Sequence, residues 1–328
     1  MNACARTIIL NALTSQACSL RFVCPSFCLG EWLGAKLGTG SFAIGCCTKV
    51  RAHLPDYVLM ENVVGVQKIM HVIQQLLGRL GYEVFCTDVL NPKMLGLPNN
   101  RPRVYFGGRL RSGLKKHSTS YGSSAFGVID RVREGFADQH PMPLEAFLLD
   151  TSNPYYSTIL SDAIPERSTQ ASEQAWLQKH AKAFANIGTS RPSTQLLKEF
   201  ADGMPSPVMA ELFLRLPLRS QEIAYFAAVV ATHSGPEVTV DLSQTIERAH
   251  INTNESSTCA SIQCFTARSL TWLVRSRRLL SGRERLAMHG ISSASASAGV
   301  ADTFLGDLAG NSFSATSFLA AFIAGCLP

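Results

Sequence analysis

The feature that most constrains the fold of this chain is a strand–helix–strand pattern between residues 57 and 106. A continuous apolar run, Tyr57–Met60, is followed by an amphipathic stretch over 66–80 that a glycine ends. Such a run is typical of a buried parallel strand, and glycine commonly terminates a helix. Further strands are predicted over 82–85 and 103–106. The alternation predicts an α/β fold with a mainly parallel sheet, whose functional residues gather at the carboxyl ends of its strands.

A change of texture divides the chain into three segments. Residues 1–112 carry the ordered pattern, 113–265 are richer in Ser, Gly and Pro, and 266–328 return to order. The middle segment still contains helical stretches, over 171–187, 193–202 and 219–231. A length of 328 residues with 46% hydrophobic content allows a sizeable core and about two domains. We therefore expect an α/β domain interrupted by a less regular insertion.

Charge and cysteine usage narrow the function classes. Lys and Arg exceed Asp and Glu by 30 to 24, which permits a polyanionic partner without requiring one. Basic residues crowd two segments, 101–116 and 275–285, which predict either phosphate contacts or solvated faces. The ten cysteines lack zinc-site spacing, and a chain of this size needs no disulfide scaffold, so we expect no metal and a reducing compartment. No run approaches the ~20 apolar residues of a membrane span.

Cysteine and glutamate residues are the first candidates for chemistry. Cys24, in FVCPSFCLG, is predicted to lie in a loop, where cationic neighbours can favour a thiolate nucleophile. Cys28 is a rival on the same argument. Glu61 directly follows the apolar run and is expected at a strand end, partly buried and able to share a proton. The alternative is a glutamate that caps the following turn.

Two arginines and a Gly-Asn pair complete the candidates. Arg101 and Arg103 are two residues apart, so strand alternation would put both guanidinium groups on one face, as a site for phosphate or a carbonyl oxygen. The alternative is a solvated strand edge. Gly310 and Asn311 are predicted to form a turn before a last helix, whose N-terminus could meet polar groups of a ligand.

Taken in order, these segments resemble the cytosine-5 DNA methyltransferase family. Val23–Cys28 resembles the family's nucleophile loop, Glu61–Val63 is its intact Glu-Asn-Val, and Asn99–Arg103 resembles its Gln-x-Arg-x-Arg. Arg278–Glu284 resembles its Arg-x-Leu-Thr-x-x-Glu helix, and Gly310–Asn311 its closing Gly-Asn. Under this resemblance the spacing to Glu61 suits Cys24 better than Cys28.

The resemblance implies a Rossmann-like S-adenosylmethionine-dependent methyltransferase fold, with 113–265 as a target-recognition insertion. It implies DNA (cytosine-5-)-methyltransferase activity on a cytosine flipped out of the duplex. Cys24 would add to C6, Glu61 would hold and protonate the ring nitrogen, and Arg101 with Arg103 would bind the ring carbonyl. Gly310 and Asn311 would contact the cofactor S-adenosylmethionine, and Asn62 and Arg278 would contact the substrate.

One part of the family pattern is missing. The family opens with a Phe-x-Gly-x-Gly turn that receives the cofactor, and only 23 residues precede Cys24, so we expect a fold incomplete at its N-terminus. A truncated gene model, a partner or missing segment that completes the cofactor site, and an inactive paralogue that binds nucleic acid are the three explanations. An RNA-directed member of the same fold is a further alternative. The family implies a nuclear location, with the cytoplasm as the alternative, and no membrane partner.

Overall fold

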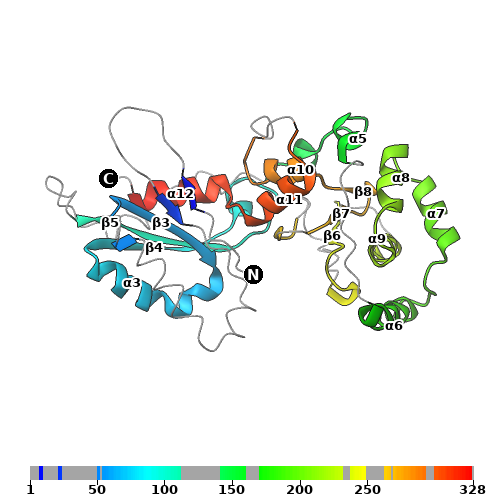
Figure 1. Cartoon of the computed structure of the whole chain (residues 1–328), viewed down its shortest axis with the longest axis horizontal. Coiled ribbons are helices and arrows are strands. Elements are labelled where there is room, and N and C mark those ends of the chain that lie inside the picture. Colours follow the sequence, from blue (N-terminus) through cyan, green and yellow to red (C-terminus); the bar gives the residue numbers. More distant parts are fainter. Residues whose placement is uncertain are drawn as a thin grey trace. The chain divides into compact units, whose positions relative to one another are not determined.

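The computed structural model describes residues 7–9, 21–23, 50–51, 54–111, 141–159, 170–231, 237–248, 262–266, 269–292 and 299–326. The chain forms two compact units (Figure 1). Unit 1 contains Met1–Leu95, Pro102–Gln139 and Phe313–Pro328, and unit 2 contains Gly96–Arg101 and His140–Ser312. The chain thus returns to unit 1 at Phe313, whereas the sequence texture placed the return at residue 266. How the three predicted segments correspond to functional domains stays a prediction.

A five-stranded sheet forms the described centre of unit 1, in the order β1 (Thr7–Ile9), β2 (Arg21–Val23), β3 (Tyr57–Val63), β5 (Arg103–Leu110) and β4 (Tyr82–Leu90). Strand β2 runs parallel to β3, whereas β5 is antiparallel to both β3 and β4. The predicted mainly parallel sheet is therefore wrong for these strands. The strand–helix–strand pattern correctly implies that β3 and β4 run in the same direction, but local sequence cannot show that β5 inserts between them.

Helices cover both faces of this sheet (Figure 1). The predicted helix over 66–80 is divided into a 3-10 helix, η1 (Val64–Ile69), and α3 (Met70–Arg79). Helix α3 packs on the face that carries Val58 and Met60. Helix α12 (Ala315–Cys326) packs on the other face, which carries Leu59 and Tyr105. This division of faces decides which side chains of β3 and β5 can meet.

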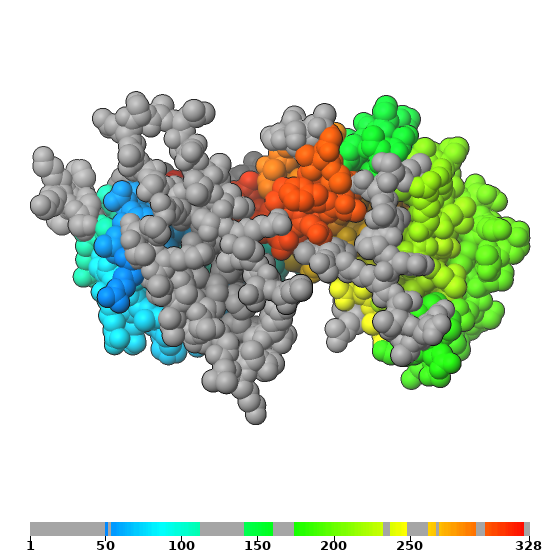
Figure 2. Space-filling view, viewed as in Figure 1, coloured from blue at the N-terminus to red at the C-terminus, as the bar shows by residue number. Residues whose placement is uncertain are grey.

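Unit 2 is mainly helical around a small antiparallel sheet. Strands β6 (Thr239–Asp241), β7 (Thr271–Leu273) and β8 (Arg278–Leu279) pair in that order. The surrounding helices include α6 (Gln170–Asn186), α7 (Thr194–Asp202), α8 (Pro207–Leu214) and α9 (Leu218–Val230), which form much of the green to yellow-green surface in Figure 2. The three helical stretches predicted for the middle segment are confirmed by α6, α7 and α9.

Side-chain caps and one apolar core explain why these helices form. Ser193 and Ser206 are the N-caps of α7 and α8, and each accepts a hydrogen bond from a backbone N–H of the first turn. Phe213, Ile223 and Trp272 are fully buried in the core that joins the helices to the sheet. The shorter elements of unit 2 are η4 (Leu144–Phe147), α5 (Tyr155–Ile159), η5 (Ile246–Arg248), α10 (Gly282–Ala287) and α11 (Asp302–Asn311).

Within the described ranges, no helix combines the length and the apolar character that a membrane crossing requires.

Candidate active site

Glu61 and Arg103 form a buried ion pair across two strands of unit 1. Glu61 lies near the end of β3, as predicted, two residues before the last residue of the strand, and is 6% exposed. In the sheet register Glu61 is opposite Tyr105, and Arg103 is opposite Val63, so the pair is diagonal on one face. Arg103 Nε lies 2.9 Å from Glu61 Oε1, and its Nη1 donates to the Pro102 carbonyl oxygen at 2.9 Å. The guanidinium group therefore fixes the orientation of the carboxylate.

Asn62 lies on the other face of β3. Side chains alternate along a strand, so Glu61 shares the α12 face with Leu59, whereas Asn62 shares the α3 face with Met60. The Asn62 Oδ1 accepts a hydrogen bond from the backbone N–H of Val63 at 2.8 Å. The structure thus gives Asn62 a local role at the end of β3, and it does not bring Asn62 and Glu61 to a common substrate.

Arg101 lies before β5 begins, so strand alternation does not pair it with Arg103 as predicted. Arg101 is 5% exposed and belongs to unit 2. Its Nη1 donates to the carbonyl oxygens of Phe265 and Gly310 at 3.1 and 3.4 Å, and lies 3.4 Å from the Cys264 thiol. Arg101 therefore joins three segments of unit 2.

Gly310 and Asn311 form the last turn of α11, in place of the predicted turn before a helix. Gly310 is buried, and its carbonyl oxygen accepts the hydrogen bond from Arg101. Asn311 is exposed, and its side-chain amide donates to the Asp307 carbonyl oxygen one turn earlier at 2.9 Å. Neither residue presents a helix N-terminus, so the expected ligand-binding geometry is absent at this pair.

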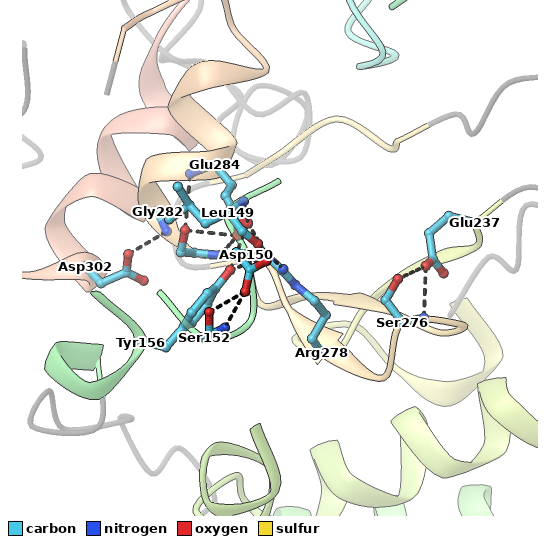
Figure 3. Close-up of polar contacts among 11 residues, drawn as sticks. Leu149, Asp150, Ser152, Tyr156, Glu237, Ser276, Arg278, Gly282, Glu284 and Asp302 are labelled. Carbon is cyan, nitrogen blue, oxygen red and sulfur yellow. Dashed lines mark hydrogen bonds and ion pairs between the residues drawn. The ribbon is translucent and has the colours of Figure 1, made fainter. Parts of the chain in front are cut away.

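Arg278 lies in a closed polar cluster of unit 2 (Figure 3). Its guanidinium group pairs with the Glu284 carboxylate and the Tyr156 hydroxyl, and donates to the Leu149 carbonyl oxygen at 2.7 Å. The Arg278 and Glu284 side chains are 3% and 0% exposed. Three acceptors thus give Arg278 an internal role, and its predicted substrate contact stays a prediction. Burial next to Glu284 also raises the pKa of Tyr156, which keeps its hydroxyl a hydrogen-bond donor.

Most of the second basic segment is likewise turned inward. Arg285 is 5% exposed and donates to the Ser269 carbonyl oxygen at 2.7 Å, and its burial lowers the pKa of the guanidinium group. Arg283 lies over the Tyr155 ring at 4.0 Å, and Arg277 donates to the Gly203 carbonyl oxygen. Arg275 alone among these residues is exposed. The segment is thus mainly part of the packing of unit 2, contrary to the solvated face that its charge suggested.

The two candidate nucleophiles, Cys24 and Cys28, lie outside the described residues. Strand β2 ends at Val23, and its residue Phe22 pairs with Leu59 of β3. Along the sequence, Cys24 follows Phe22 by two residues, and Glu61 follows Leu59 by two residues. In the parts of the chain that the structure describes, no group of three or more His, Cys, Asp or Glu residues could hold a metal ion.

Sequence reasoning missed Tyr156 and gave Glu284 no role beyond its place in the family motif. Tyr156 is 122 residues away from Arg278 in the chain, so no local pattern links them. Glu284 does have a sequence signal: Ser281-x-x-Glu284 is a capping box, in which each side chain bonds the other's backbone N–H. The same carboxylate accepts hydrogen bonds from Tyr156 and from the Leu149 backbone at 2.8 and 2.7 Å.

Unit 1 thus defines an α/β protein whose sheet carries a buried carboxylate–guanidinium pair on one face. Residues 24–288 match the model of the C-5 cytosine-specific DNA methylase family. Because this match covers most of the chain, the protein belongs to that family, and the fold class predicted from the sequence is confirmed.

The curated relatives are bacterial methyltransferases. The type II methyltransferases M.NgoBV of Neisseria gonorrhoeae and M.NlaIV of Neisseria lactamica are each 35% identical to this chain over 104 residues. The match covers 28% of this chain and only 24% of either relative, about a quarter of their length.

Solved structures resemble the chain more widely but more weakly. The Dnmt2 methyltransferase of S. pombe gives a TM-score of 0.46 at 13% identity, covering 92% of this chain and 75% of that one. The methyltransferase EhMeth of Entamoeba histolytica gives 0.42 at 13% identity with the same coverage. These low scores add no weight, and the family membership rests on the sequence match.

Proposed function

We propose that this protein methylates C5 of cytosine in DNA. The observation that carries the proposal is the Glu61–Arg103 pair, in which a carboxylate 6% exposed is oriented by a guanidinium group at 2.9 Å. Such a pair offers a proton-sharing group and a fork of donors to the N3 and O2 edge of a pyrimidine. A stacked base cannot reach it, so the target cytosine is flipped out of the duplex at a cost of a few kcal/mol.

The chemistry on the base begins with the thiolate of Cys24. It adds to C6, the electron pair of the C5–C6 double bond moves to make C5 enamine-like, and N3 takes a proton from the Glu61 carboxyl group. Arg103 orients Glu61 and donates a hydrogen bond to the carbonyl oxygen O2 of the base. After C5 gains its substituent, a water molecule takes the C5 hydrogen as a proton, the electron pair of that C–H bond re-forms the C5–C6 double bond, Cys24 leaves C6 as a thiolate, and N3 returns its proton to Glu61.

The methyl donor of the proposed reaction is S-adenosylmethionine, which supplies a methyl cation equivalent to the activated C5. The contacts of Gly310 and Asn311 with this donor, which the sequence resemblance implied, stay a prediction. The Gly310 carbonyl is bound by Arg101, and the Asn311 amide is bound by its own helix. The steps above therefore concern the base only.

The test is hydrogen exchange at C5, which the enamine undergoes without any methyl donor. The full chain is incubated with duplex DNA in D₂O, and deuterium in the recovered deoxycytidine is measured by mass spectrometry. We expect exchange by the unmodified protein and a loss of about 10²-fold or more in Cys24→Ser and in Glu61→Gln. Cys28→Ser is the matched control and should keep exchange within about threefold.

Other outcomes decide the alternatives. Loss of exchange in Cys28→Ser with retention in Cys24→Ser would move the nucleophile to Cys28. Exchange on RNA but not on DNA would give an RNA-directed enzyme. No exchange on either, with nucleic-acid binding intact, would overturn the proposal in favour of an inactive binding paralogue. A nuclear location remains part of the proposal and follows from the family alone.

A further inference from the structure

Strand β4, which pairs with the strand that carries Arg103, contains an irregularity between Cys86 and Val89. In the β4–β5 register Cys86 is opposite Phe106, and Val89 is opposite Val104. Thr87 and Asp88 therefore both oppose Tyr105, which is the two-against-one count of a β-bulge. Bulges bend a strand and redirect side chains, and they are frequent beside active sites.

Thr87 closes this bulge with its side chain. Its Oγ1 accepts the hydrogen bond of the Tyr105 backbone N–H at 3.0 Å, and Thr87 is 3% exposed. A side-chain oxygen thus replaces the carbonyl of a regular ladder. Because the Tyr105 N–H points towards β4, Tyr105 and Glu61 form a non-hydrogen-bonded pair on the other side, where facing side chains lie closest.

The bulge also reverses the alternation of β4. Before it, Cys86 packs on the α3 face and Phe85 on the α12 face. After it, Val89 packs on the α3 face, and Leu90 on the α12 face, where it is opposite Arg103 and 1% exposed. The extra residue therefore places the apolar side chain of Leu90 beside Arg103, on the face that carries Glu61.

We infer that Thr87 is a positioning residue for the Glu61–Arg103 pair: by holding the bulge through the Tyr105 N–H, it sets where β5 presents Arg103 to Glu61. This inference rests on the proposed function for its catalytic consequence, but the geometric claim is independent of it. Asp88, the extra residue of the bulge, is exposed.

Thr87→Val and Thr87→Ser form the test pair. Valine keeps the shape and removes the acceptor, whereas serine keeps the hydroxyl. We expect Thr87→Val to lower kcat for C5 exchange about tenfold or more, with KM for DNA within about twofold, because the defect concerns the pair and not DNA binding. Thr87→Ser should restore kcat to within about threefold.

A purely structural role is separated by a second core variant. Leu77→Ala removes a fully buried side chain on the α3 face, away from the ion pair. Measured well below its own melting temperature, it should keep kcat near that of the unmodified protein. An equal loss of kcat in Leu77→Ala and Thr87→Val would overturn the positioning role.

The position of the Arg103 side chain can be measured without any activity assay. The ¹⁵Nε–¹H resonance of Arg103, assigned by its absence in Arg103→Lys, reports the contact with Glu61. It should shift in Thr87→Val and stay in place in Thr87→Ser. An unchanged resonance in Thr87→Val would reject the inference even if the enzyme is active. Conversely, a shift in a protein without exchange activity would support the inference while the proposed function fails.

Discussion

Glu61 and Arg103 are 42 positions apart and meet because of strand register. Each is two residues from the other's cross-strand partner, and both point to the face that α12 covers. A carboxylate 6% exposed loses much hydration on folding, and the guanidinium group at 2.9 Å offsets part of that cost. The planar fork of arginine suits this task better than a lysine ammonium group.

Arg103→Lys tests whether the planar guanidinium group of Arg103 is required. Lysine keeps the charge but offers no planar, directional donors, so we expect C5 exchange to fall by about 10–10²-fold with little change in DNA affinity. Arg109→Lys is the matched control, because Arg109 lies on the same strand and stacks over the Tyr57 ring at 5.6 Å. A similar loss in both variants would show that the effect is a general disturbance of β5.

At this scale the sequence was informative where the chemistry is local. The setting of Glu61 after an apolar run and the family pattern at Arg103 predicted two residues that the structure brings into contact. Asn62 and Arg278 were assigned to the substrate by the same pattern, but alternation turns one to the opposite face and burial encloses the other. A motif gives residue types, whereas distant contacts such as Tyr156–Arg278 decide what each side chain touches.

At the scale of elements, several buried polar contacts of unit 2 meet at the N-terminus of α10. Glu284 caps its own helix, neutralises Arg278 and holds the segment that contains Leu149 and Tyr156 (Figure 3). Removal of one member leaves the other charge buried, which costs about 3–5 kcal/mol.

Glu284→Gln should therefore lower the free energy of unfolding by about 3–5 kcal/mol in urea titrations followed by a probe in unit 2. Glu211→Gln is the matched control, since Glu211 of α8 pairs with Arg215, the C-cap residue of that helix, and both side chains are about half exposed. That surface pair should contribute no more than about 0.5 kcal/mol. Equal effects of the two substitutions would mean that the cluster of Figure 3 does not act as a buried unit.

Close packing of α10 against α11 depends on a glycine at their contact. A Cβ on Gly282 would lie 2.4 Å from the Asp302 carbonyl oxygen and 2.6 Å from the Gly306 nitrogen, which are backbone atoms and cannot turn aside. We expect Gly282→Ala to destabilise unit 2 by about 1–3 kcal/mol or more. Gly78→Ala in α3 should instead stabilise by about 0.5–1 kcal/mol, because a Cβ there meets nothing within 4 Å. Urea unfolding measures both.

The contribution of Tyr82, at the start of β4, to the free energy of unfolding depends on pH. Its hydroxyl donates to the Pro55 carbonyl oxygen at 2.6 Å, and burial, with a smaller effect of Asp56, raises the pKa of Tyr82 to about 12. The folded state thus favours the neutral phenol, so this contribution to stability is complete below pH ~10 and is lost as the pH rises from ~10 to ~12. The destabilisation caused by Tyr82→Phe should therefore be smaller at pH 11 than at pH 9 in urea unfolding. A pH-independent difference would contradict the assigned shift.

Elements were predictable where periodicity is local and strong. The predicted helical stretches became α6, α7 and α9, of which α7 has its own N-cap, Ser193, and β3 and β4 follow from apolar runs on either side of α3. The position of β5 between them was not predictable, because strand order is fixed by non-local pairing. The same holds for the Thr87–Asp88 bulge, which depends on a hydrogen bond between adjacent strands.

For the whole molecule, the formal net charge of +6 does not say which cations a polyanion would meet. Arg278 and Arg285 are 2% and 5% exposed and compensated inside unit 2, whereas Arg275 of the same segment is exposed. Counterion release depends on cations that reach phosphates, not on those buried in a core. The distribution of exposed charge, and not the sequence total, should therefore govern binding to DNA.

The salt dependence of DNA binding tests this distinction. If Arg275 contacts a phosphate, Arg275→Gln should reduce the slope of log K against log salt concentration by about 1, with little loss of stability. Arg278→Gln removes the same formal charge from a neighbouring position, yet it should leave the slope unchanged and lower the free energy of unfolding instead, because Glu284 and Tyr156 lose a buried partner. Fluorescence anisotropy between low and moderate salt measures the slopes, with folding checked by urea titration. Equal reductions of slope in both variants would mean that Arg278 reaches the nucleic acid after all, and that the cluster around it opens when DNA binds.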